Sequence, residues 1–193
     1  QAAAEATRDG AVMRGKSNEN GTNIIDWTVG ATQGTADYVV PQSGDEGVPV
    51  RVYGPKDQAD VLPALLWIHG GGYCFGSLMG DDYSVKRMVE EIGCVVISVD
   101  YRLAPECPFP EPLNDCYSAL VWVFDNAEML KVDPSRIAIG GISAGGGLAA
   151  GLALLARDRA EVSVVFQALL CPMIDNNSIS ESSYSVSDGR IWN

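Results

Sequence analysis

One short segment of the sequence combines a hydroxyl nucleophile with the small residues that such a group needs around it. Gly141-Ile142-Ser143-Ala144-Gly145 follows the apolar run 137–139 and opens a stretch made largely of Gly, Ala and Leu. A serine between a strand and a helix is held in a strained turn, and glycines two positions to either side let neighbouring backbone approach. The segment predicts that Ser143 is a nucleophile at the carboxyl end of a sheet. The alternative is an ordinary glycine-rich turn.

A second segment supplies hydrogen-bond donors of the kind that acyl transfer needs. His69-Gly70-Gly71-Gly72-Tyr73 directly follows the apolar run 62–68. Successive glycines leave backbone N–H groups unshielded, and such groups stabilise the negative charge that a carbonyl oxygen gains when a nucleophile adds to it. Gly71 and Gly72 are two candidate donors, and Ala144 is a third. A phosphate-binding loop is disfavoured, because neither G-x-G-x-x-G nor Gly-Lys-Ser/Thr is present.

The general base that a serine nucleophile requires is not evident in the sequence. Serine normally needs a histidine that a carboxylate orients, and no histidine follows Ser143. The only histidine, His69, begins the glycine segment, on the side of the site that should donate hydrogen bonds. We therefore predict that the base belongs to polypeptide outside this sequence. Asp175 is an alternative position for a supporting acid, although closing a strand is its more expected role.

The composition argues against several classes of partner. The 193 residues include 13 Lys+Arg and 25 Asp+Glu, a net charge of −12, whereas nucleic-acid affinity depends on clustered cations. No apolar run reaches the roughly 18 residues of a membrane span. The five cysteines lack Cys-x-x-Cys spacing and the one histidine has no thiol pair beside it, so no metal site is predicted. We expect a cytoplasmic location, with secretion left open by sequons at Asn20 and Asn176.

Apolar runs and helical patterns alternate along most of the chain. Residues 1–35 have no strong period apart from a weakly helical opening at 2–6, and 36–40 with 48–53 predict an antiparallel hairpin. Strand, helix, strand, helix then implies parallel strands and a doubly wound α/β sheet. The buried strands are expected at 62–68, 94–99, 137–139 and 162–170, and the helices at 82–92, 113–126 and 144–159.

The motifs, in this order and spacing, resemble the hormone-sensitive-lipase group of α/β-hydrolases over residues 36–175. They are His69-Gly70-Gly71-Gly72, then 100–106 (DYRLAPE) with Phe109-Pro110 and Asp115, then 141–146 (GISAGG). The resemblance implies an α/β-hydrolase fold and a carboxylesterase or lipase that acts on short- to medium-chain acyl esters without a cofactor. It also implies that about six of the eight core strands are present. In the family, the catalytic acid and histidine follow the seventh and eighth strands, which are not found in this sequence.

The resemblance assigns a role to each matching residue. Ser143 is the expected nucleophile, and the N–H groups of Gly71, Gly72 and Ala144 form the expected oxyanion hole. Ile142 departs from the family, which commonly has an acidic residue there. Residues 1–35 are expected to form part of a cap, 36–175 the hydrolase core, and 176–193 the start of a cap insertion. The expected supports of the loops around the site are His69, Asp100, Arg102, Glu106 and Asp115.

Three interpretations of the missing base remain open. The sequence is the front portion of a longer esterase, whose remainder is a missing segment or a second chain; or it is a binding module, like the gibberellin receptors that resemble this family; or it is an inactive remnant. The first is favoured, because a sheet that ends at the sixth strand exposes apolar surface on 164–170 and an unpaired edge. We expect this portion alone to be inactive, and the substrate to be a small acyl ester.

Overall fold

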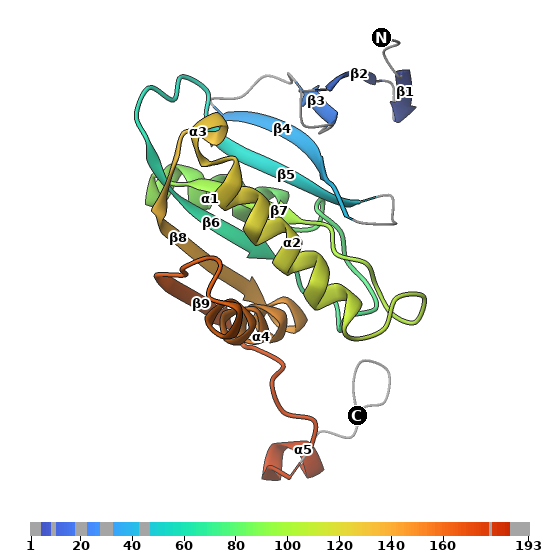
Figure 1. The fold of residues 1–193 in the computed structure, drawn as a ribbon. Coiled ribbons are helices and arrows are strands. Elements are labelled where there is room, and N and C mark those ends of the chain that lie inside the picture. The colour runs from blue at the N-terminus through green and yellow to red at the C-terminus, as the bar shows by residue number, and fades with distance from the viewer. Residues whose placement is uncertain are drawn as a thin grey trace.

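The described part of the chain forms one mixed β-sheet with helices on both faces (Figure 1). The computed structural model describes residues 5–8, 11–17, 23–27, 33–42, 47–177 and 179–185. The order of the strands in the sheet is β1-β2-β3-β4-β5-β7-β6-β8-β9. Their bounds are β1 Glu5–Arg8, β2 Ala11–Ser17, β3 Asn23–Trp27, β4 Gln33–Val40, β5 Val48–Pro55, β6 Leu62–Ile68, β7 Val95–Val99, β8 Val132–Ile142 and β9 Phe166–Leu170.

The direction of the strands changes in the middle of the sheet. Strands β1 to β5 run antiparallel to their neighbours, and β5 is also antiparallel to β7. From β7 through β6 and β8 to β9 every pair is parallel. The expected hairpin is present as β4 and β5, which pair from Val40 opposite Val48 to Gln33 opposite Pro55. Strands β4 to β9 thus form the expected six-strand α/β-hydrolase sheet.

Both faces of the central strands are buried, which explains their continuous apolar sequences. Ala64, Leu66 and Ile68 of β6 join one apolar cluster, which includes residues of the helices α2 and α4. Leu65 and Trp67 point to the opposite face and pack with the helix α1. Successive side chains of a strand alternate between the faces. A strand that lies between two layers of helices must therefore be apolar at every position.

The described residues include three longer helices and two short ones. α2 and α4 lie side by side on one face, and α1 covers the other (Figure 1). The helices predicted at 82–92 and 144–159 are confirmed with these bounds, and the one predicted at 113–126 starts two residues earlier. The bounds are α1 Asp82–Ile92, α2 Glu111–Asp125, α3 Ala127–Leu130, α4 Ala144–Arg159 and α5 Glu181–Ser185.

The prediction for residues 1–35 was wrong in its secondary structure. β1, β2 and β3 extend the sheet by antiparallel pairing, where a weakly helical opening at 2–6 was expected. Residues 5 and 6 lie in β1, and residues 2–4 lie outside the described residues. Helix propensity is a weak local preference, which pairing with a neighbouring strand readily overrides. β8 is longer than the predicted 137–139 and β9 is shorter than 162–170, while α3 and α5 were not predicted.

The last strand of the sheet has an exposed apolar edge. β9 pairs with β8 on one side, and no described strand pairs with its other side. Val165 and Phe166 are 59% and 63% exposed, and Leu170 at the end of the strand is 43% exposed. Exposed apolar side chains next to unpaired backbone groups are typical of a strand that another segment covers.

Candidate active site

Ser143 lies in a sharp turn between β8 and α4. Its backbone has φ 56° and ψ −118°, a region that residues with a side chain rarely adopt. Three backbone hydrogen bonds hold the turn in place. The Ser143 N–H donates to the carbonyl of Leu170 (2.9 Å), and the Ser143 carbonyl accepts from the N–H groups of Gly147 and Met173 (3.0 Å each). The contacts of the surrounding chain therefore maintain a strained backbone, as is typical of functional sites.

The glycines on either side of Ser143 are required by close backbone contacts. A Cβ atom on Gly145 would lie 2.1 Å from the carbonyl oxygen of Ile68, at the end of β6. A Cβ atom on Gly141 would lie 2.4 Å from the backbone of Gly145. Any side chain at either position would push β6, β8 and α4 apart. The predicted reason for these glycines, close approach of neighbouring backbone, is thus present in the structure.

The glycine segment after β6 begins beside the serine turn. A Cβ atom on Gly70 would lie 3.4 Å from the Cβ atom of Ser143. Gly71 and Gly72 then adopt φ values of +123° and +59°, and the carbonyl of Gly71 accepts hydrogen bonds from the N–H groups of Cys74 and Phe75. The structure thus brings the start of this segment against Ser143. Ala144, the third candidate donor, begins α4, where backbone N–H groups lack partners within the helix.

A hollow of about 240 Å³ opens beside Ser143. Of the three successive glycines, Gly70 lines this hollow, as does Ile142, which precedes the serine. Asp81 also lines the hollow, where its carboxylate accepts a hydrogen bond from the indole N–H of Trp67 (2.7 Å). The full lining consists of His69, Gly70, Gly76, Ser77, Gly80, Asp81, Ile142 and Ser143.

His69 is enclosed by the loops around the site. Its side chain is 2% exposed, its Nδ1 donates to the carbonyl of Gly70 (2.7 Å), and its ring stacks on Tyr101. Its Nε2 makes no hydrogen bond within the described residues and lies 4.0 Å from Oδ1 of Asp100. Burial raises the pKa of the Tyr101 hydroxyl, which stays protonated and donates to the carbonyl of His69 (3.0 Å). These contacts hold the residue that precedes the glycines.

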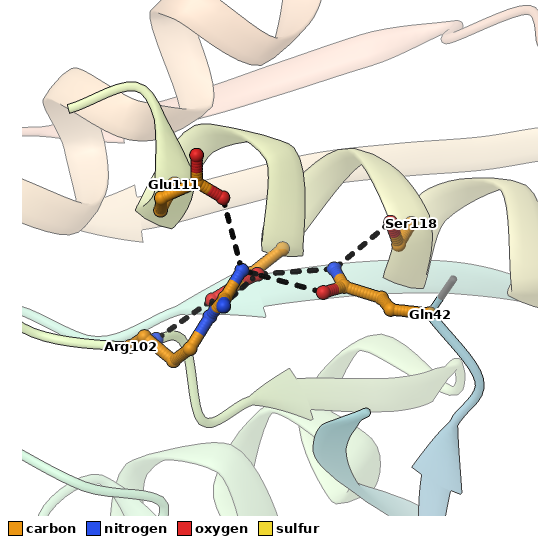
Figure 2. Close-up of polar contacts among 5 residues, drawn as sticks. Gln42, Arg102, Glu111 and Ser118 are labelled. Carbon is orange, nitrogen blue, oxygen red and sulfur yellow. Dashed lines mark hydrogen bonds and ion pairs between the residues drawn. The ribbon is translucent and has the colours of Figure 1, made fainter. Parts of the chain in front are cut away.

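A buried ion pair organises the loop that follows β7. Asp115 of α2 is fully buried and accepts hydrogen bonds from Nη2, Nε and the backbone N–H of Arg102, at 2.7, 3.0 and 2.9 Å. Gln42, just after β4, donates to the same carboxylate (3.0 Å) and to Ser118 (3.1 Å), and Glu111 accepts from Arg102 (3.1 Å), as Figure 2 shows. Sequence reasoning singled out Arg102 and Asp115 but missed Gln42, because no motif distinguishes a lone glutamine after a strand.

The other predicted supports differ in their surroundings. Asp100 accepts a hydrogen bond from the N–H of Leu78 (3.3 Å) and lies near His69. Glu106 is exposed, and within the described ranges it forms no hydrogen bond or ion pair. The supporting role of Glu106 therefore stays a prediction. Among the residues that the structure describes, no three His, Cys, Asp or Glu side chains are grouped so that they could hold a metal ion.

The comparisons with known proteins agree with this architecture. Residues 65–193 match a family described by the alpha/beta hydrolase fold. Over 133 residues the chain is 45% identical to carboxylesterase NlhH of Mycobacterium tuberculosis, covering 69% of this chain and 42% of that protein. Over 155 residues it is 41% identical to arylacetamide deacetylase of Bos taurus, covering 76% and 38%. The chain therefore belongs to the α/β-hydrolase family, in the hormone-sensitive-lipase group that its motifs resemble.

Solved structures of esterases are also similar to this chain. A bacterial heroin esterase superposes with a TM-score of 0.77 at 43% identity, covering 83% of this chain and 50% of that one. EstE1, a thermostable carboxylesterase from a metagenomic library, gives a TM-score of 0.75 at 44% identity, covering 80% and 53%. The chain thus spans about half the length of these structures and less than half of the two curated relatives. In the described part, no helix is long and apolar enough to cross a bilayer.

Proposed function

We propose that Ser143 is the nucleophile of a carboxylester hydrolase. The observation that carries this proposal is the strained, positive-φ backbone of Ser143 at the junction of β8 and α4, with Gly70 packed against it. In the proposed reaction, Ser143 Oγ attacks the ester carbonyl and transfers its proton to a general base. The alcohol then leaves, and water hydrolyses the acyl-enzyme to release the acid. The esterases and carboxylesterases among the relatives support this class of reaction.

The proposed oxyanion hole consists of the N–H groups of Gly71, Gly72 and Ala144. The positive φ values of the two glycines and the position of Ala144 at the start of α4 support this assignment. Fixed backbone donors stabilise the negative charge of the tetrahedral intermediate without reorganising. The short- to medium-chain acyl esters expected from the resemblance are the proposed substrates, and the hollow beside Ser143 is the proposed place for part of such an ester.

The proposed general base lies on polypeptide beyond these residues, either a further segment of the same protein or a second chain. Two observations support this. The matched part of this chain covers only 42% of carboxylesterase NlhH and 50% of the bacterial heroin esterase, and the exposed edge of β9 is open to further strands. His69 is not the proposed base, because its Nε2, the nitrogen left to accept a proton, is buried, lies 4.0 Å from Oδ1 of Asp100 and forms no hydrogen bond with Ser143. The cap expected from residues 1–35 and 176–193 stays a proposal; within the described residues, β1 to β3 extend the sheet at the edge opposite β9.

Replacing Ser143 tests the proposed function. In the full-length protein that contains this chain, Ser143→Ala is expected to lower p-nitrophenyl-ester turnover by roughly 10⁴- to 10⁶-fold, because the covalent step is lost. The matched control is Ser84→Ala, which removes the hydroxyl of an exposed serine on α1 and is expected to leave turnover unchanged. Undiminished turnover in Ser143→Ala would remove Ser143 from the mechanism. A wild-type protein that binds such esters without hydrolysing them would favour a receptor on the same fold.

A further inference from the structure

Tyr73, the residue after the three glycines, connects the glycine segment to the serine turn. Its φ of +64° lies in the left-handed region, which is unfavourable for a residue with a side chain. Specific contacts must therefore hold it there, and they are made by both ends of the residue. The Tyr73 carbonyl accepts from the N–H of Ala104 (2.9 Å), in the loop that Arg102 and Asp115 organise. The hydroxyl bonds to a different segment of the chain.

The Tyr73 hydroxyl donates to the backbone carbonyl of Met173 (2.9 Å), a residue 100 positions later in the chain. The N–H of Met173 in turn donates to the carbonyl of Ser143 (3.0 Å). Burial raises the pKa of the Tyr73 hydroxyl, which therefore remains a donor. Two hydrogen bonds on a single peptide segment thus connect the glycine segment with the backbone of the nucleophile.

The first turn of α4 leaves space for this connection. A Cβ atom on Gly147 would lie 2.2 Å from the carbonyl oxygen of Met173 and 2.4 Å from the hydroxyl of Tyr73. Glycine is unfavourable inside a helix, so its presence at 147 is explained by the hydrogen bond that crosses the helix at this position. Gly146 has a similar role, because a Cβ there would lie 3.1 Å from Pro172.

We propose that Tyr73 is a positioning residue, whose hydrogen bond to Met173 sets the spacing between the amides of the glycine segment and Ser143. This inference rests on the proposed function. Removing the hydroxyl removes neither the nucleophile nor the amide donors. It removes a restraint on the glycine segment, which carries two of those donors. These donors are aligned for the tetrahedral intermediate and not for the bound ester. Their misalignment is therefore expected to lower kcat and to leave KM nearly constant.

The test is Tyr73→Phe in the full-length protein with p-nitrophenyl acetate as substrate. Loss of one neutral hydrogen bond predicts a fall in kcat of about tenfold, with KM within about twofold of wild type. The inhibition constant of a trifluoromethyl ketone, whose adduct with serine carries an oxyanion, is expected to rise by the same factor as kcat falls. Gly147→Ala disturbs the same hydrogen bond from the helix side and is expected to give the same split between kcat and KM.

The matched control is Tyr117→Phe, which removes the hydroxyl that donates to Glu161, away from the proposed site, and is expected to change neither constant. Unchanged kcat and ketone inhibition in Tyr73→Phe, or a rise in KM alone, would overturn the inference while leaving Ser143 as the nucleophile. A wild-type protein without esterase activity would overturn both this inference and the proposed function. Measuring Ser143→Ala in the same assay distinguishes a failure of the Tyr73 inference from a failure of the proposed function.

Discussion

The Asp115 carboxylate is the most heavily bonded acidic group near the site. It has no exposed surface and accepts hydrogen bonds from the side chain and backbone of Arg102 and from Gln42. Burial of a charge is unfavourable unless such partners compensate it. The group joins α2 to the end of β4 and to the loop after β7, which in turn contacts Tyr73 through Ala104.

Replacing Asp115 therefore tests the structural role of this ion pair. Asp115→Ala is expected to lower the free energy of unfolding by about 3 to 5 kcal/mol, because it leaves the Arg102 guanidinium without its buried partner. Glu111→Gln is the control, since Glu111 is 44% exposed and its ion pair is expected to contribute at most about 1 kcal/mol. Urea unfolding monitored by fluorescence provides both values. Equal losses in the two variants would contradict the proposed importance of the buried pair.

Individual site residues differed in how far the sequence could predict them. The positions of Ser143 and the glycines could be predicted because a strained turn and a close backbone contact leave few residue types possible. Gln42 and the Tyr73–Met173 contact could not, because each joins segments that are distant in the sequence. Gln42 is 73 residues from Asp115, and Tyr73 is 100 residues from Met173. Such contacts become visible only when the fold brings their elements together.

Among the elements, α4 depends most on its surroundings. Its first turn contains three successive glycines, Gly145 to Gly147, which are poor helix formers. The helix nevertheless packs against β8, β9 and α2, so tertiary contacts maintain it. Its bounds could be predicted because the apolar strand before it and the charged residues at its end mark them. The strands β1 to β3 could not be predicted in this way, since their sequences have no clear alternation and pairing determines their structure.

Two alanine substitutions within α4 distinguish the effect of close packing on stability from the effect of helix propensity. Gly145→Ala is expected to destabilise the protein by about 3 kcal/mol, because the new methyl group would overlap the Ile68 carbonyl at 2.1 Å. Gly151→Ala meets only the side chain of Leu113, at 3.6 Å, and is expected to stabilise by about 0.5 to 1 kcal/mol through better helix propensity. Thermal unfolding gives both shifts. Stabilisation by both substitutions would show that propensity alone governs this helix.

At the scale of the whole molecule, the unpaired edge of β9 bears most directly on whether further strands complete the sheet. The central strands β6 and β7 are buried, yet Phe166 and Leu170 of β9 are exposed. A chain that covers about half of its structural relatives and has an apolar edge of this kind fits a larger folded unit. The proposed general base would then lie on the same polypeptide that covers this edge.

Hydrogen exchange can test this arrangement. We expect those backbone amides of 166–170 that point away from β8 to exchange rapidly in the 193-residue chain and slowly in the full-length protein, because further strands would protect them. The amides of β6, which pair on both sides in the structure, are the internal control and are expected to be protected in both. Equal exchange of β9 in the two proteins would indicate that no further strand pairs with this edge.

The central claim, that Ser143 is an activated nucleophile, is most directly tested by covalent labelling. The full-length protein is treated with a fluorophosphonate, digested with trypsin and analysed by mass spectrometry. The predicted result is a phosphonyl adduct on the peptide 137–157, in which Ser143 is the only serine, and no adduct on that peptide in Ser143→Ala. An active wild-type enzyme that carries its adduct on a different residue, or is not labelled at all, would contradict the account.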